Sequence, residues 1–225
     1  MSRKPPSART AGPVGRDDVL AELRRVVDEA AAGRGRLLLV AGEAGIGKTT
    51  MLTAARDAAK GEGFRVLRAR GAQLEREYAF GVVRQLVEPL LAETPSAERA
   101  LLMDGPPGLA AQLLGIPRAH DSMIGDSPVA PDPGFAVLHG LYWLFANLAA
   151  ERPVALVVDD VHWADRASLR FLAFLLPRLE ELRAMVLLAA RPAEAGASRE
   201  LMAAITMDPA TIGRCSRFSS RASSG

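Results

Sequence analysis

The chain has a single cysteine, Cys215, among its 225 residues. One thiol excludes an internal disulfide and a zinc site built from cysteines. Long apolar runs are missing too: the longest, such as residues 185–190, have the length of a strand and fall far short of a membrane-spanning helix. The first residues, in which Pro5 and Pro6 follow two cations, lack the apolar core of a signal peptide. We therefore expect a cytoplasmic protein without a membrane partner.

Lysine is nearly as scarce as cysteine, with Lys4, Lys48 and Lys60 against 25 arginines. Six of the cations lie in residues 1–10 and 211–225, where there is no acid, and the formal net charge of +2 becomes −4 when these six are left out. The body of the chain therefore lacks the basic surface that nucleic acid requires. We expect no direct DNA binding by this chain.

The second lysine lies in the most informative stretch of the sequence. An apolar run at 37–40 leads into Gly-Glu-Ala-Gly-Ile-Gly-Lys-Thr at 42–49, which fits the P-loop spacing GxxxxGK[ST] without a gap. In such a loop the backbone N–H groups, and those of the helix that follows, point at phosphate oxygens. The sequence therefore predicts a nucleotide phosphate site formed by Gly42, Ala44, Gly45, Ile46, Gly47, Lys48, Thr49 and Thr50.

Three side chains of this loop have distinct predicted roles. Lys48 would reach the β- and γ-phosphates, and the Thr49 hydroxyl would take one coordination position on Mg²⁺. Thr50 would place a second hydroxyl near the α-phosphate. Lysine carries a compact point charge, so its presence here in an otherwise arginine-rich chain favours a phosphate-binding role.

A second apolar run, residues 153–158, ends in Asp159 and Asp160. A continuous apolar run is typical of a strand buried on both faces of a parallel sheet, and acids at its end look like a Walker B element. Asp159 would hold Mg²⁺ opposite Thr49, and Asp160 would orient or deprotonate the attacking water. The alternative is a pair of helix-capping aspartates.

Arg191 ends a third apolar run, at 185–190, and is a candidate catalytic sensor of the γ-phosphate, because an arginine stabilises charge on the transferred group. The alternative is a surface arginine before a turn proline. The short segment 64–70 is interrupted by three arginines, which favours a place at the edge of a sheet.

Apolar runs of strand length alternate with segments of helical periodicity along the chain. This alternation predicts an α/β fold, a three-layer P-loop NTPase sandwich with a mostly parallel sheet whose ligands lie at the carboxyl ends of the strands. We expect the domain to span residues 14–208, with a disordered arm at 1–13 and a mobile loop at 116–134. Residues 209–225 read as an unstructured tail, for which a frameshifted end is the preferred explanation.

With these pieces in place, the sequence resembles the ATPase module of the large ATP-binding LuxR-family regulators, within the STAND class of AAA-like P-loop NTPases. The matching segments are Val-Gly-Arg at 14–16, the P-loop at 42–49, Val-Val-Asp-Asp-Val-His-Trp-Ala-Asp at 157–165 and Leu-Leu-Ala-Ala-Arg-Pro at 187–192. The resemblance implies that Val14, Gly15 and Arg16 lie near the adenine. It also implies that Arg191 is the sensor and that ATP binding sets a regulatory switch.

In the family resembled, the module continues into a fifth strand, a lid and a DNA-binding domain. We expect the fifth strand and the lid to be missing here, which would leave residues 37–40 as an open apolar edge. The predicted behaviour is weak ATP binding, slow Mg²⁺-dependent hydrolysis and self-association through that edge. Two alternatives stay open: a nucleotide-binding or interaction fragment without turnover, and a P-loop kinase acting on a small molecule.

Overall fold

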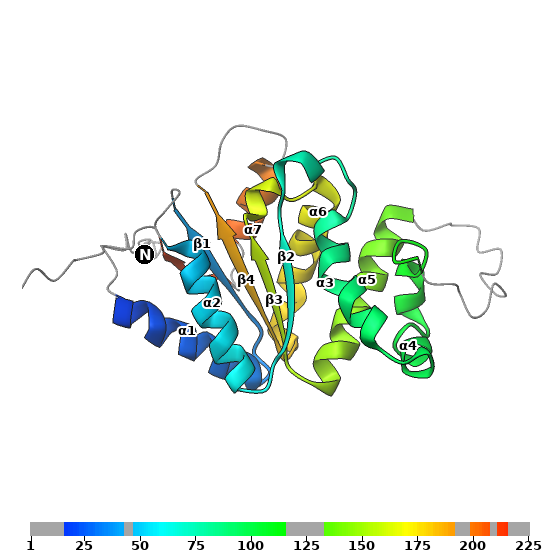
Figure 1. The fold of residues 1–225 in the computed structure, drawn as a ribbon, viewed down its shortest axis with the longest axis horizontal. Coiled ribbons are helices and arrows are strands. Elements are labelled where there is room, and N and C mark those ends of the chain that lie inside the picture. Colours follow the sequence, from blue (N-terminus) through cyan, green and yellow to red (C-terminus); the bar gives the residue numbers. More distant parts are fainter. Residues whose placement is uncertain (1–15, 43–46, 116–132, 192–198, 208–210, 216–225) are drawn as a thin grey trace, which may run out of the picture.

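The computed structural model describes residues 16–42, 47–115, 133–191, 199–207 and 211–215, with their helices and strands shown in Figure 1. The predicted arm at 1–13, nearly all of the predicted loop at 116–134 and the chain beyond residue 215 lie outside the described residues.

A parallel sheet of five strands forms the centre of the molecule, in the order β2-β3-β4-β1-β5. Every strand pair in it is parallel. The carboxyl ends of all five strands therefore lie at the same end of the sheet, where α/β folds bind their ligands. The strands are β1 (Arg36–Ala41), β2 (Arg65–Arg70), β3 (Val154–Asp159), β4 (Ala184–Ala190) and β5 (Thr211–Cys215).

Helices cover both faces of this sheet. α1 and α2 pack on one face, and α3, α6 and α7 pack on the other, with α4 and α5 beyond them (Figure 1). Within the described ranges no helix is long and apolar enough to cross a membrane. The α-helices are α1 (Arg16–Ala31), α2 (Lys48–Gly61), α3 (Gly81–Glu93), α4 (Ser96–Leu102), α5 (Pro133–Glu151), α6 (Arg166–Leu175) and α7 (Arg199–Met207). Short 3₁₀ turns are η1 (Gln73–Glu75), η2 (Pro106–Ala110), η3 (Val161–Trp163) and η4 (Leu176–Glu181).

The apolar runs explain why the inner strands are buried on both sides. Successive side chains of a strand point to opposite faces. Along β4, Val186 and Leu188 enter the core beneath α3 and α6, whereas Met185 and Leu187 enter the core beneath α1 and α2. All seven residues of β4 are buried. The prediction of a three-layer α/β sandwich with a parallel sheet is confirmed.

The prediction that the fifth strand is missing is wrong. β5 pairs with β1 in parallel, from Leu37 opposite Thr211 to Val40 opposite Cys215, with a register shift between Leu38 and Leu39. Residues 37–40 therefore have a strand on both sides and are no open edge. The expectation of an unstructured chain from residue 209 is wrong for 211–215 as well, and self-association through this edge loses its basis. The prediction that β2 lies at a sheet edge is confirmed.

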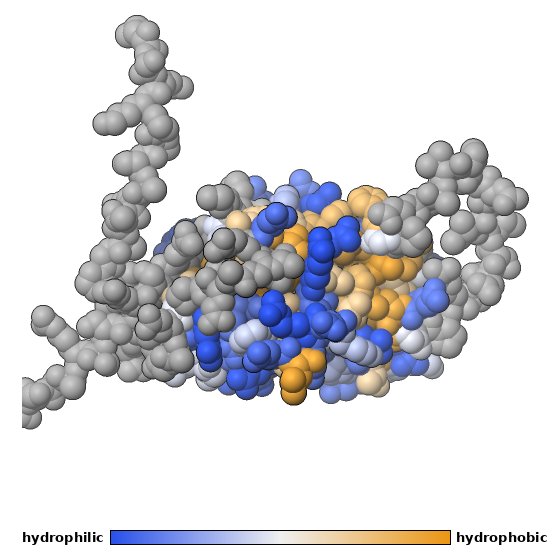
Figure 2. Space-filling model, turned by 90° about the horizontal axis from the view of Figure 1, so that it is seen from above, coloured by the Kyte–Doolittle hydropathy of each residue, from blue (hydrophilic) through white to orange (hydrophobic). Residues whose placement is uncertain are grey.

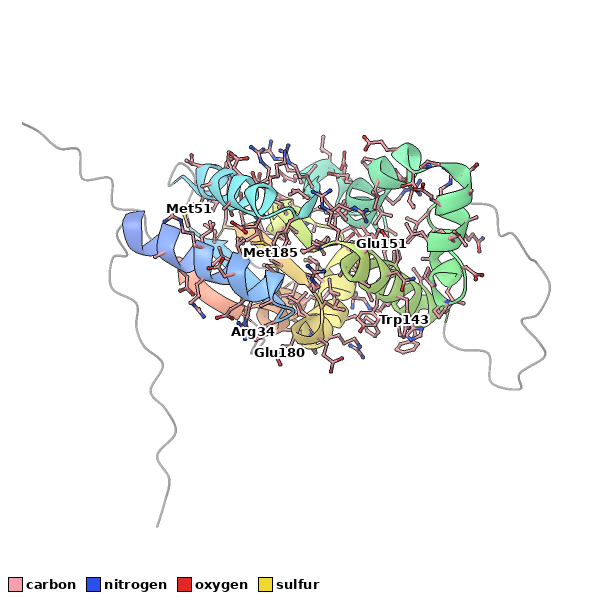
Figure 3. All side chains as sticks on the ribbon, turned by 90° about the horizontal axis from the view of Figure 1, so that it is seen from below. Arg34, Met51, Trp143, Glu151, Glu180 and Met185 are labelled. Atoms are coloured by element: carbon pink, nitrogen blue, oxygen red, sulfur yellow. The ribbon has the colours of Figure 1, made fainter. Side chains whose placement is uncertain are left out.

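Glu29 connects α1 to the start of β1. The strands begin at the end of the sheet that faces the viewer in Figure 3, near the label of Glu180. The Glu29 carboxylate accepts from Arg36 Nε and from Arg25 Nη1, each at 2.7 Å. The hydrogen bond from Arg36, followed by the charge of Arg25, lowers the pKa of Glu29 below its usual range. Because the folded-state pKa is depressed, the resulting stability is present above the unfolded pKa and is lost as the pH falls through the folded value.

We therefore expect Glu29→Gln to lower the free energy of unfolding by about 0.5–1 kcal/mol at pH 7. The difference from the parent should shrink as the pH is lowered from 7 towards 3, because a growing share of the parent carboxylate then becomes neutral, as the amide is at every pH. Urea unfolding curves of both proteins at the two pH values measure this. A gap of the same size at both would show that charge is not the cause.

Candidate functional site

The residues on either side of the predicted phosphate loop, Gly42 before it and Gly47 after it, lie at the carboxyl ends of the strands. The Gly42 N–H donates to the Ala190 carbonyl at 3.1 Å, which fixes the end of β1 against β4. Gly47 precedes α2 with φ of +87°, a left-handed conformation that favours glycine. The ammonium of Lys48 donates to the Gly42 carbonyl at 2.7 Å, and the side chain is only 8% exposed. The Lys48 side chain is thus directed back towards the end of β1.

Several residues of the predicted site lie outside the part of the chain that the structure describes. Ala44, Gly45 and Ile46 lie outside the described residues, as do Val14 and Gly15. Arg16 is the first residue of α1, and its side chain is outside the described part. Thr50 is exposed in the first turn of α2. The predicted adenine contacts therefore stay predictions.

The structure brings Thr49 and Asp159 together from distant parts of the chain. Thr49 Oγ1 lies 3.1 Å from Asp159 Oδ2, and the other carboxylate oxygen accepts from the Asp160 N–H at 2.9 Å. A hydroxyl and a carboxylate are the hard oxygen donors that Mg²⁺ prefers, and this ion takes few protein ligands because phosphates and water complete its shell. The pair fits Mg²⁺ on these grounds. Within the described ranges there is no cluster of three or more metal-binding His, Cys, Asp or Glu side chains.

Asp160 adopts φ of +49°, which is unusual for a non-glycine residue. Its carboxylate accepts from Arg70 of β2, at 2.9 Å from Nη2 and 3.2 Å from Nε. The pairing raises the pKa of the Arg70 guanidinium, mainly through the hydrogen bond to Asp160. The Asp160 side chain is 15% exposed and that of Arg70 73%, so the ion pair is partly open to water.

Sequence reasoning missed Arg70 as a site residue and saw only a charged edge strand. The signal was its position, because β2 ends level with Asp159 in the parallel register. Gln85 of α3 fixes this strand end by accepting from the Arg70 N–H at 2.9 Å and donating to its carbonyl. Gly71 follows, and a Cβ there would come within 2.4 Å of the Asp160 carbonyl. The close approach of β2 to Asp160 therefore depends on glycine.

Arg191 lies just beyond β4 at the same edge of the sheet. Its N–H donates to His162 Nδ1 at 3.3 Å, and its side chain is exposed. His162 thus connects the turn after β3 with the end of β4. Viewed onto the carboxyl ends of the strands, hydrophilic side chains cover much of the middle of the molecule (Figure 2).

The sequence from 12 to 188, more than half of the chain, matches the family model described as an AAA ATPase domain. The chain belongs to the AAA ATPase domain family. Members of this family bind nucleotide, usually with Mg²⁺, which agrees with the arrangement of Lys48, Thr49 and Asp159. A search of curated proteins found no match.

Two of the solved structures that match this AAA ATPase domain cover most of it, at low identity. A DNA replication initiation factor is 15% identical, with a TM-score of 0.41, and the match covers 91% of this chain and 47% of that one. A chain from a structure of Drosophila ORC bound to GC-rich DNA and Cdc6 is 13% identical, with a TM-score of 0.40, covering 90% of this chain and 57% of that one. The domain therefore spans about half the length of these proteins.

Proposed function

We propose that this AAA ATPase domain binds Mg²⁺·ATP and hydrolyses it slowly, as a nucleotide switch. The observation that carries the proposal is the approach of Thr49 Oγ1 to within 3.1 Å of Asp159 Oδ2. It joins a P-loop helix to a Walker B strand at the position where a metal-bound triphosphate is held in P-loop enzymes. The buried Lys48 completes the site on the loop side.

Each residue then has a separate task. Lys48 places a positive charge against the β- and γ-phosphates, and the Thr49 and Asp159 oxygens hold the metal ion. Bound Mg²⁺ supplies charge neutralisation at the phosphate oxygens. Asp160 orients the attacking water and accepts its proton, for which it must leave the Arg70 guanidinium. Arg191, exposed at the end of β4, stabilises charge on the γ-phosphate.

The regulatory setting rests on the resemblance to the LuxR-family modules. We propose that the domain works in the cytoplasm as the switch of a transcription regulator of the STAND class, with Val14, Gly15 and Arg16 near the adenine. DNA binding would belong to another domain of such a regulator, because residues 11–210 carry a net negative charge.

The proposal is tested by titrating Lys48→Ala with a fluorescent ATP analogue. We expect its affinity to be at least about tenfold weaker than that of the parent, because a hydrogen bond to a charged group contributes about 1.5–3 kcal/mol. Lys60→Ala is the matched control, since it removes an exposed lysine from the other end of the same helix. Equal affinities for Lys48→Ala and the control would refute the phosphate role of Lys48.

A second prediction concerns the Arg70–Asp160 ion pair. Arg70→Gln should raise the rate of ATP hydrolysis two- to fivefold. In the parent, Asp160 must first separate from Arg70, and breaking this largely exposed ion pair adds about 0.5–1 kcal/mol to the barrier. Steady-state phosphate release measures the rate, and Arg170→Gln, an exposed arginine on α6, is the control. A slower Arg70→Gln enzyme would mean that Arg70 assists the reaction. Absence of turnover in the parent would favour the non-hydrolysing alternative.

A further inference from the structure

A groove leads from the predicted metal site along the side of α2 that faces β2. It is a cavity of about 360 Å³ whose walls are α2 and β2 and whose floor is β3. We call it the arginine groove, because its polar lining consists mainly of Thr49, Thr53 and Arg56 from α2, Arg68 and Arg70 from β2, and Asp159 from β3.

The edge position of β2 creates this groove. Alternate residues of β2 point to opposite faces, and Leu67 and Ala69 are buried in the core under α3. Arg68 and Arg70 therefore point to the face that carries α2. Because β2 is an edge strand, both arginines line the cavity beside α2.

The three arginines of the groove differ in their partners. Arg56 pairs with the neighbouring Asp57 at 2.8 Å, and Arg70 pairs with Asp160. Arg68 is exposed and forms no ion pair with any side chain in the described part of the chain. Arg68 is therefore the guanidinium of the lining whose charge is not met by a carboxylate of the described residues. An exposed arginine of this kind, in a cavity that a second arginine also lines, favours an anion that both can bind.

Arg56 of α2 and Arg68 of β2 lie too far from the phosphate loop to contact a bound nucleotide. Thr49, Thr53 and Arg56 follow one another at helical spacing, which places Arg56 roughly 10 Å beyond Thr49 along the helix axis. On β2, Arg68 pairs in register with Val157, two residues before the level of Asp159. The phosphates of a P-loop nucleotide lie at the other side of Thr49, at the start of the helix. The far end of the groove is therefore separate from the nucleotide site.

We propose that the far end of the arginine groove binds the compact oxyanion of a small molecule, a phosphate or a carboxylate, through Arg68 and Arg56. The planar fork of a guanidinium matches either oxyanion with two parallel hydrogen bonds. A cavity of this size accepts a ligand of a few hundred Å³. This inference goes beyond the proposed ATPase activity. The far end of the arginine groove includes no residue of the proposed ATP site. A ligand held there would extend its other end towards Thr49 and Asp159.

The test uses the full chain carrying Lys48→Ala, so that the phosphate loop does not compete for the probe. Pyrophosphate, inorganic phosphate and citrate are titrated by calorimetry at constant ionic strength. We expect saturable binding of at least one of them. Adding Arg68→Gln should weaken that binding at least about tenfold, because one charge-assisted contact is lost. Arg170→Gln, on the opposite face of the sheet, should leave it unchanged.

The outcomes separate the two ligand sources. Tighter binding of pyrophosphate or phosphate than of citrate identifies a phosphorylated ligand, and the reverse identifies a carboxylated one. No saturable binding of any probe, or equal affinities with and without Arg68→Gln, would overturn the proposal. Urea unfolding of each variant verifies that it is folded. Failure of the parent to bind ATP would refute the proposed function alone, because these titrations do without Lys48.

Discussion

Replacing Asp160 with asparagine is expected to leave ATP binding intact and to slow hydrolysis at least about 100-fold. An amide has nearly the shape of a carboxylate, but it cannot accept the proton of the attacking water. Asp160 directly follows Asp159, the carboxylate that we propose as a ligand of Mg²⁺, and the Asp160 side chain has access to water. The two neighbouring acids thus have environments suited to different tasks: Asp159 contacts the Thr49 hydroxyl, and Asp160 contacts the exposed guanidinium of Arg70.

Two measurements on Asp160→Asn test this division. Fluorescent-ATP titration should give the parent affinity, and phosphate release under saturating ATP should show the loss. Asp104→Asn is the control, since Asp104 is an exposed acid in the turn after α4. Turnover of Asp160→Asn at the parent rate would move the base elsewhere, and Glu43 is the next candidate by position.

The parts of the fold that were predictable are those with a strong local pattern. The continuous apolar runs that became β3 and β4 demanded burial on both faces, and only a sandwich supplies it. The P-loop spacing predicted a helix after the glycine turn, and α2 begins at Lys48, directly after the left-handed Gly47. The contact between Thr49 and Asp159 then followed from the rule that parallel strands end at one edge.

β5 was missed because its residues carry no apolar alternation, with glycine and arginine at 213 and 214. Its pairing partner supplies the missing signal: β1 would otherwise expose unpaired N–H and C=O groups along an apolar edge. Arg70 was missed for a related reason. Its partner, Asp160, lies 90 residues away, and nothing local in the sequence states which residue a strand end will face.

Asp165 has more hydrogen-bond partners than its position in the sequence indicates. It directly precedes α6, and its Oδ1 accepts from the Ser168 N–H at 2.8 Å, as an N-cap side chain does. The same carboxylate also accepts from the N–H groups of Phe80 at 2.7 Å and Val82 at 3.3 Å, at the start of α3. Asp165 is 3% exposed, so one buried carboxylate serves the first N–H groups of two helices.

Asp165→Ala is therefore expected to lower the free energy of unfolding by about 3 kcal/mol or more, well beyond the roughly 1 kcal/mol of an ordinary helix cap. The variant leaves buried donors of both helices without an acceptor, and it releases Phe80 from a left-handed conformation at φ of +61°. The measurement is urea unfolding, with Asp28→Ala, an exposed acid of α1, as the control.

Asp165→Asn separates the two sources of this loss, since it keeps one side-chain oxygen as an acceptor but removes the charge. We expect an unfolding free energy between those of the parent and the alanine variant. A loss of about 1 kcal/mol in Asp165→Ala would show that only the α6 cap matters.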